Sequence, residues 1–328
     1  PWNTPFWIPF KSGVPSLMAG NTYVIKPAPN VADTTFLVGE IFEEAGFNNG
    51  EFQTALLDNE QSSRAIADPR VAGVTFTGSP VTGALIAQQA GAALKKSVLE
   101  LGGSDPFIVL KDAPIEEVAR KAVLGRVLNS GQVCISPKRM IIDKSVMKEF
   151  QKHAIKFMDL VKFGDPMDET VNFGTMARQD IYEKVQAQVE EAKNIGDQMV
   201  FQKIHDNASG LYFPPTIMQS DNVDSVLRND EVFGPVLVLI PADDEEHAVE
   251  IANSSQFGLG GSVWTKDKKK GEEIAHRIET GAMYVNQVER VDIRFPFGGT
   301  KKSGYGRECG AYGIKEFTCP KTVWIEKQ

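Results

Sequence analysis

Short apolar segments alternate with helix-like patterns over the first hundred residues. Segments rich in β-branched and aromatic side chains predict four strands, at residues 22–26, 52–56, 72–76 and 97–101. Apolar positions recur at helical spacing between them and predict helices at residues 31–45, 61–67 and 80–90. Strands that alternate with helices predict a parallel sheet joined by right-handed crossovers.

The same alternation begins again after residue 105. Strands are predicted at residues 106–110, 138–142, 236–240, 261–264 and 282–285. Helices are predicted at residues 112–129, 145–162, 178–195, 244–254 and 267–278. Asp112 is the predicted cap of the first of these helices. The fold class is therefore α/β with two parallel-sheet domains.

Three further segments lie outside this alternation. Residues 163–177 and 202–215 are rich in Gly, Pro, Asp and Asn and predict loops. Residues 317–325 predict an isolated final strand, which needs a partner in the same chain or in another. Because the sequence opens with Pro1 inside a motif, we expect further chain upstream, and a sheet edge left exposed without it.

Composition and charge exclude several classes of protein. The net charge of the 328 residues is −8 and the basic residues are dispersed, which argues against binding to nucleic acid or to an anionic membrane. No apolar run is long enough to span a bilayer. The cysteines (134, 309 and 319) and the four histidines are isolated, so we expect no metal site and a reducing, cytoplasmic compartment.

The segment around Ser79 is the first candidate for chemistry. Gly78 and Ser79 follow a predicted strand and open a predicted helix, with Ser79 suited to the N-cap and Pro80 to the first helical position. The free N–H groups of such a turn suit a pyrophosphate. A plain glycine turn is the alternative, because no G-x-G-x-x-G motif is present.

Two reactive residues follow. Glu100 stands between leucines at a strand end, where burial would raise its pKa toward that of a general base; a solvated glutamate is the alternative. Cys134 follows the turn at Gly131, and it is either a reactive thiol or a small buried apolar residue.

Taken together, these motifs resemble the aldehyde dehydrogenase superfamily. Six motifs occur in the family's order over nearly the whole chain: Pro1-Trp2-Asn3, Lys26-Pro27, Phe76-Thr77-Gly78-Ser79, Glu100-Leu101-Gly102-Gly103 with Gly131-Gln132-Val133-Cys134, Glu231-Val232-Phe233-Gly234-Pro235, and Pro296-Phe297-Gly298-Gly299 with its downstream glycines. Within that superfamily, Gly103-Ser104-Asp105-Pro106 and the general run of the sequence resemble the prokaryotic succinate-semialdehyde dehydrogenases.

The resemblance implies a role for each motif. Cys134 would attack the aldehyde, Asn3 and the Cys134 backbone N–H would hold the oxyanion, and Glu100 would activate water to release the acid. NAD or NADP would be bound by a set of residues spread along the chain: Trp2, Lys26, Pro29, Gly78, Ser79, Leu101, Gly102, Glu231 and Phe233. It also implies a Rossmann-like cofactor domain at residues 1–101, a catalytic domain at 102–298, and a return segment at 299–328 whose strand joins a homodimer or homotetramer.

The sequence departs from the family pattern at the adenosine site. Pro29 replaces the glutamate by which many NAD-preferring relatives bind the 2′-hydroxyl, so use of both cofactors is expected. Glu100 itself favours hydrolysis over transfer of the acyl group to coenzyme A.

The substrate is the least specified part of the prediction. An ω-carboxylate substrate needs a cation, and the candidates are Lys11, Arg290 and Arg294, since Leu128 stands where some members carry an arginine. The alternative is that Lys11 is a surface lysine and that the arginines pair with nearby acids. Another aliphatic or aromatic aldehyde, a silent binding or structural member of the family, and a thiol esterase remain as alternative functions.

Overall fold

A computed structural model describes residues 1–48, 50–205 and 210–326. The chain forms two compact units. The first unit comprises residues 1–100, 291–298 and 305–328, and the second comprises residues 101–290 and 299–304. The chain therefore returns to the first unit at residue 291, earlier than the predicted boundary at residue 298, and residues 299–304 lie with the second unit.

The first unit is built from short parallel strands and the helices that follow them. Its strands are β1 (Tyr23–Ile25), β2 (Phe52–Thr54), β3 (Gly73–Thr77) and β4 (Lys96–Glu100), with β14 (Gly304–Tyr305) beside β4. Its helices are α1 (Trp7–Met18), η1 (Pro29–Val31), α2 (Ala32–Glu44), α3 (Asn59–Ala67), α4 (Pro80–Ala92) and α11 (Gly310–Glu316). β1 pairs in parallel with β2, and β3 pairs in parallel with β4.

Aromatic stacking holds α2 against β2 in this unit. The rings of Phe42 and Phe52 lie 4.3 Å apart at an interplanar angle of 15°, and Val38 is fully buried beside them. Phe10 of α1 also stacks on Phe42, with ring centroids 5.3 Å apart. This small apolar core fixes the helix that follows Lys26.

The second unit contains a seven-stranded sheet. Its strands, in spatial order, are β12 (Tyr284–Val285), β11 (Ser262–Trp264), β5 (Pro106–Val109), β6 (Arg139–Asp143), β9 (Val236–Ala242), β8 (Thr216–Gln219) and β7 (Gln198–Gln202). All neighbours are parallel except β7, which pairs antiparallel with β8. A separate antiparallel pair is formed by β10 (Phe257–Gly258) and β13 (Thr300–Lys301).

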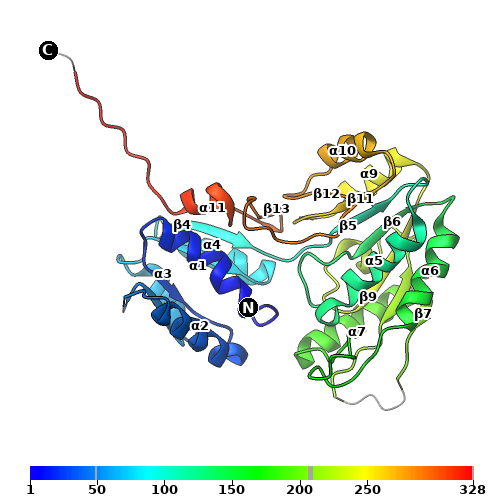
Figure 1. Cartoon of the computed structure of the whole chain (residues 1–328), viewed down its shortest axis with the longest axis horizontal. Helices are drawn as coiled ribbons and strands as arrows, with labels where there is room; N and C mark the ends of the chain where they lie inside the picture. The colour runs from blue at the N-terminus through cyan, green and yellow to red at the C-terminus, as the bar shows by residue number, and fades with distance from the viewer. Residues whose placement is uncertain (49, 206–209, 327–328) are drawn as a thin grey trace. The chain divides into compact units, whose positions relative to one another are not determined.

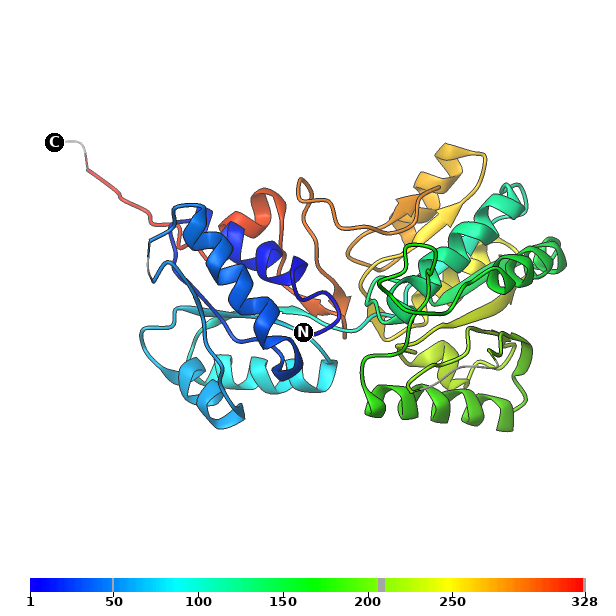
Figure 2. The same cartoon turned by 60° about the horizontal axis from the view of Figure 1, so that its bottom comes forward.

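Helices cover both faces of this sheet, and consecutive residues of its strands point alternately to one face and to the other. Phe107 and Val109 pack with α5 (Ile115–Val127) and α6 (Met147–Asp159), whereas Ile108 between them packs with α7 (Gln179–Asn194) and α9 (Glu245–Asn253). Figures 1 and 2 show α5 and α6 side by side. The remaining helices are η2 (Leu128–Gly131), α8 (Val226–Asn229) and α10 (Lys268–Arg277). A strand buried on both faces is a continuous apolar run in the sequence, as residues 106–110 are.

Most predicted elements are confirmed to within a few residues, and several were missed. The missed elements are η1, α1, α8 (Val226–Asn229), α11, β7, β8 and the two-residue strands β10, β13 and β14. Asp112 does not cap α5, whose N-cap is Pro114. Instead the Asp112 carboxylate accepts hydrogen bonds from the Thr265 hydroxyl at 2.9 Å and from the Lys266 N–H at 2.9 Å.

The predicted strand at the C-terminal end is not found in the single chain. Residues 318–326 carry no secondary structure, and Figure 1 shows them as an extended segment after α11. Val323, Trp324 and Ile325 are 71%, 88% and 83% exposed. None of the described helices is long and apolar enough to cross a membrane.

Candidate active site

Glu100 is a buried carboxylate at the end of β4. It is 2% exposed, so the alternative of a solvated glutamate is wrong. Its pKa is raised to about 7, because burial raises the pKa strongly, the Lys11 ammonium opposes part of the rise, and the Glu308 carboxylate adds to it. Glu100 Oε1 accepts no hydrogen bond from the part of the chain that the structure describes. A carboxylate with this pKa and an available oxygen is suited to take a proton near neutral pH.

Lys11 of α1 lies between two carboxylates of the first unit. Its Nζ is 2.6 Å from Glu308 Oε2 and 3.7 Å from Glu100 Oε2, and its side chain is 4% exposed. The interpretation of Lys11 as a surface lysine is therefore wrong. Its role toward a substrate carboxylate stays a prediction, and this geometry disfavours it because two acids already neutralise the charge.

The glycine motif near residue 298 shapes the surroundings of Glu100. A Cβ on Gly298 would lie 2.9 Å from Glu100 Oε1 and 2.6 Å from the Gly306 carbonyl oxygen. The Glu308 backbone pairs with Phe297 through two hydrogen bonds of 2.7 Å, and the Phe297 ring lies 4.4 Å from Lys11 Nζ. Only glycine permits this close approach, so the motif places both the second carboxylate and the lysine.

Cys134 lies on a tightly held loop of the second unit. The chain leaves α5 through three consecutive left-handed residues, with φ of 50° at Asn129, 54° at Ser130 and 76° at Gly131. Left-handed non-glycine residues persist only where surrounding contacts impose them. Here Ser130 donates to the Gly174 carbonyl at 2.9 Å, and Gln132 accepts from the Ala177 N–H at 2.9 Å.

Close packing joins this thiol loop (residues 130–137) to the loop of residues 231–235. A Cβ on Gly131 would lie 2.3 Å from the Gly234 carbonyl carbon and oxygen. Arg126 of α5 is fully buried and donates to the Ser136 hydroxyl and to the carbonyls of Val232 and Gly234. One guanidinium thus fixes both loops.

Glu231 is the first residue of the loop of residues 231–235. Its Oε1 accepts the Gly103 N–H at 3.1 Å and lies 3.6 Å from Lys138 Nζ. Burial raises the pKa of Glu231, and the Lys138 ammonium opposes the rise. A Cβ on Gly102 would lie 2.2 Å from Glu231 Oε2. The structure therefore brings Gly102 and Glu231, two predicted cofactor residues, into contact within the second unit.

The predicted cofactor residues Lys26, Pro29 and Ser79 follow the ends of strands β1 and β3 in the first unit. Ser79 is the N-cap of α4 as predicted, its hydroxyl accepts the Thr82 N–H at 3.3 Å, and Pro80 is the first helical residue. Lys26 directly follows β1, and both Lys26 and Pro29 are exposed. Ligands of open α/β sheets bind outside the carboxyl ends of parallel strands, so these positions suit a nucleotide.

The remaining predicted residues divide between the two units. Trp2 and Asn3 precede α1 and, like Phe233, are partly buried. Arg294 is 74% exposed in its side chain and binds Asp292 at 2.7 Å, which fits the alternative of local pairing. Arg290 is exposed, and its carbonyl accepts the Tyr284 hydroxyl at 2.6 Å. Asn3 and Glu100 belong to the first unit and Cys134 to the second, so their shared role stays a prediction.

Sequence reasoning missed three buried residues of these surroundings: Glu308, Lys138 and Arg126. Glu308 lies in the segment Gly306-Arg307-Glu308, downstream of the predicted Pro296-Phe297-Gly298-Gly299 motif, and could have been noted as a second acid. The two cations carry no sequence signal beyond their closeness to Cys134.

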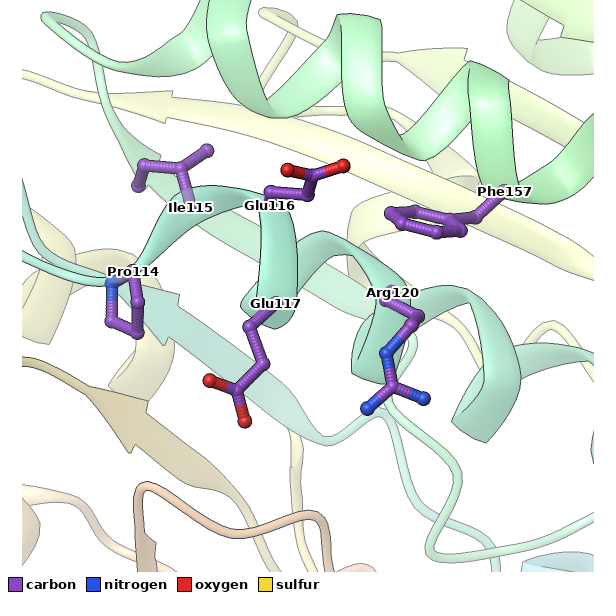
Figure 3. Close-up of a pocket in the computed structure, with 6 residues that line it drawn as sticks. All are labelled: Pro114, Ile115, Glu116, Glu117, Arg120 and Phe157. Carbon is purple, nitrogen blue, oxygen red and sulfur yellow. The ribbon is translucent and has the colours of Figure 1, made fainter.

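An open depression lies apart from this chemistry, at the start of α5. Figure 3 shows its lining residues: Pro114, Ile115, Glu116, Glu117, Arg120 and Phe157. The acids there have lysine partners, since Glu116 binds Lys156 at 2.7 Å and Glu117 binds Lys121 at 3.0 Å. Its two carboxylates are exposed and paired with lysines, so it is no candidate for catalysis.

Comparison with known proteins gives the family. A model of the aldehyde dehydrogenase family matches residues 1–323. The chain belongs to the aldehyde dehydrogenase family. It is an oxidoreductase of that class, with the α/β fold of aldehyde dehydrogenases.

Individual relatives in the aldehyde dehydrogenase family support the assignment. The succinate semialdehyde dehydrogenase [NAD(P)+] of Escherichia coli K12 is 42% identical over 327 residues, which are 100% of this chain and 71% of the relative. The crystal structure of succinic semialdehyde dehydrogenase from Streptococcus pyogenes with NADP+ is 34% identical with a TM-score of 0.95, over 100% of this chain and 72% of that one. An aldehyde dehydrogenase mutant from Pseudomonas syringae with NAD+ and octanal is 31% identical with a TM-score of 0.92, over 97% and 66%.

Proposed function

We propose that this aldehyde dehydrogenase oxidises succinate semialdehyde to succinate with NAD or NADP. The observation that carries the reaction is Glu100, a buried carboxylate whose pKa of about 7 suits a general base. The succinate semialdehyde assignment rests on the names of relatives such as those of E. coli and S. pyogenes.

The residues present fit a nicotinamide dinucleotide. The capped N-terminus of α4 at Ser79 would bind the pyrophosphate, and exposed Lys26 would bind the adenosine ribose. Glu231 would bind the nicotinamide ribose through an oxygen of its carboxylate. When bound, the nicotinamide supplies the oxidant for the conversion of the thiohemiacetal into the thioester.

Cys134 performs the covalent step in this proposal. Its thiolate sulfur forms a bond to the aldehyde carbon, and the carbonyl π electrons move to oxygen. The Asn3 amide and the Cys134 backbone N–H donate to that oxyanion. Loss of one such donor costs about 10²–10³ in turnover in other enzymes, so Asn3→Ala is expected to be severely impaired but not inactive.

Glu100 performs the hydrolytic step. It takes a proton from water as the water oxygen attacks the thioester carbon, and the Cys134 thiolate leaves. The acid departs, and Glu100 passes its proton to solvent. The base thus acts only after oxidation, so Glu100→Gln should retain the acylation burst and lose steady-state turnover.

The test is the initial rate of NAD or NADP reduction with succinate semialdehyde, for the wild type and for Cys134→Ala. Butanal, hexanal and benzaldehyde serve as the comparison substrates. We expect the wild type to reduce cofactor, with its highest kcat/KM for succinate semialdehyde, and Cys134→Ala to be inactive. A wild type that prefers hexanal would overturn the substrate assignment, and one that oxidises none of the four would favour a silent, binding member of the family.

We further propose that residues 317–325 pair with a second copy of the chain. The support is the exposed apolar triplet Val323, Trp324 and Ile325. Removal of residues 318–328 should lower the mass measured by light scattering to that of a smaller assembly. An unchanged mass would contradict the proposal.

A further inference from the structure

Lys138 is a buried lysine whose ammonium contacts the backbone of the proposed nucleophile, Cys134. It lies between Cys134 and β6, and it is 2% exposed. Its Nζ donates to the Cys134 carbonyl at 2.6 Å and to the Val133 carbonyl at 3.0 Å. A buried ammonium is costly unless it is paired and hydrogen-bonded, so these contacts reflect a specific placement.

The contact with Val133 acts on the peptide group of the nucleophile. The Val133 carbonyl oxygen and the Cys134 N–H belong to one planar peptide unit, in which they point in opposite directions. A cation on the oxygen therefore fixes the direction of the N–H. It also draws electron density toward the oxygen, which makes the N–H a stronger donor.

The counter-charge of Lys138 is the carboxylate of Glu231, a proposed cofactor-binding residue. Glu231 Oε1 lies 3.6 Å from its Nζ. Burial raises the pKa of the Asp105 and Glu289 carboxyls, and the positive charge of Lys138 opposes that rise. The neighbouring buried cation, Arg139, faces elsewhere, because its guanidinium donates to the carbonyls of Ser104, Ile251 and Ala252. Lys138 alone, of these two, contacts both the thiol loop and Glu231.

We propose that Lys138 is a positioning residue that holds the Cys134 N–H in the direction of the developing oxyanion. It acts on the reacting atoms through the Val133–Cys134 peptide unit, and it couples that unit to Glu231. The inference rests on the proposed function, in which this N–H is an oxyanion donor.

Hydrolysis of p-nitrophenyl acetate without cofactor isolates this role. Acylation of Cys134 by the ester develops the same oxyanion, and it needs neither Glu231 nor a nucleotide. The variants are Lys138→Met, which keeps the length and removes the charge, Lys138→Arg, which restores a cation, and the control Lys144→Met, which removes an exposed lysine and its ion pair with Asp243. Melting temperature and circular dichroism establish folding for each.

Lys138→Met should lose at least tenfold in the acylation rate, by comparison with about 10²–10³ for direct loss of a donor. Lys138→Arg should recover part of that loss. The control Lys144→Met should acylate within twofold of wild type. If Lys138→Met does not fold, the comparison of Lys138→Arg with Lys144→Met gives the same distinction, with the slower acylation expected in Lys138→Arg.

Three outcomes overturn the inference. They are a folded Lys138→Met with wild-type acylation, an equal acylation loss in the control Lys144→Met, and a wild type that releases no p-nitrophenol. A wild type that is acylated but reduces no cofactor with any aldehyde would overturn the proposed function instead, and would leave the role of Lys138 intact.

Discussion

The Lys11 ammonium lies 3.7 Å from the Glu100 carboxylate and 2.6 Å from that of Glu308. One buried cation thus serves two buried acids of the first unit. Because Lys11 favours the charged form of Glu100, it holds the pKa of this base near 7 against the opposing effect of burial.

Lys11→Met should shift the pH profile of turnover to higher pH. Without the ammonium, burial and the Glu308 charge both raise the pKa of Glu100 further, so a smaller fraction is deprotonated at pH 7. We expect kcat at pH 7 to fall several-fold and to recover in part at pH 9. The pH dependence of kcat measures this, and Lys96→Met, which removes an exposed ion pair with Glu316, is the control. An unchanged profile would show that Lys11 does not set the basicity of Glu100.

Glu100→Gln should stabilise the protein more at pH 8.5 than at pH 5. The folded pKa of Glu100, about 7, lies above its ordinary value of 4.5, so folding favours the protonated form. The contribution of Glu100 to the free energy of unfolding is fully present below pH 4.5 and is lost as the pH rises through 7. The difference is on the order of 3 kcal/mol at most. Urea unfolding at both pH values checks it, with exposed Glu43→Gln as the control. Equal effects at the two pH values would contradict the raised pKa.

Local chemistry explains which parts of the fold the sequence predicted. Ser79 and Pro80 predict the start of α4 correctly, because N-cap and first-turn preferences depend on adjacent residues alone. The buried strands of the second unit were equally recognisable as apolar runs. By contrast, α1 contains Gly13 and Pro15, which normally argue against a helix, and was missed.

The surroundings of the site depend on contacts that sequence spacing does not reveal. Lys11 and Glu308 are nearly 300 residues apart, and no local pattern distinguishes their ion pair from two solvated charges. The ion pair between Lys138 and Glu231 could not be predicted from sequence patterns either, although the family motif identifies Glu231 itself. The motif residues were thus predicted from resemblance, whereas the groups that set their charge required the folded chain.

Gly131→Ala should disrupt the thiol loop, whereas Gly91→Ala should not. Gly131 has a φ of 76°, and a Cβ there would lie 2.3 Å from the Gly234 backbone. Backbone must move to relieve this overlap, so we expect a loss of about 3 kcal/mol or more of stability and a large loss of activity. Gly91 lies in α4, and a Cβ there would have no atom within 4 Å. Alanine at this position should raise the free energy of unfolding by about 0.5–1 kcal/mol. Thermal unfolding of both variants tests the difference, and equal effects would contradict the close packing.

Pro29→Glu should turn the enzyme toward NAD. Position 29 is exposed at the start of η1, close in sequence to Lys26, where the adenosine ribose is proposed to bind. A carboxylate there can accept a hydrogen bond from the 2′-hydroxyl of NAD but repels the 2′-phosphate of NADP. We expect kcat/KM for NADP to fall at least tenfold while that for NAD is retained or raised. Pro29→Gln is the matched control, since it offers a hydrogen bond without the charge and should discriminate less. If Pro29→Glu leaves the NADP rate unchanged, the 2′-phosphate lies elsewhere and cofactor choice is set by other residues of the first unit.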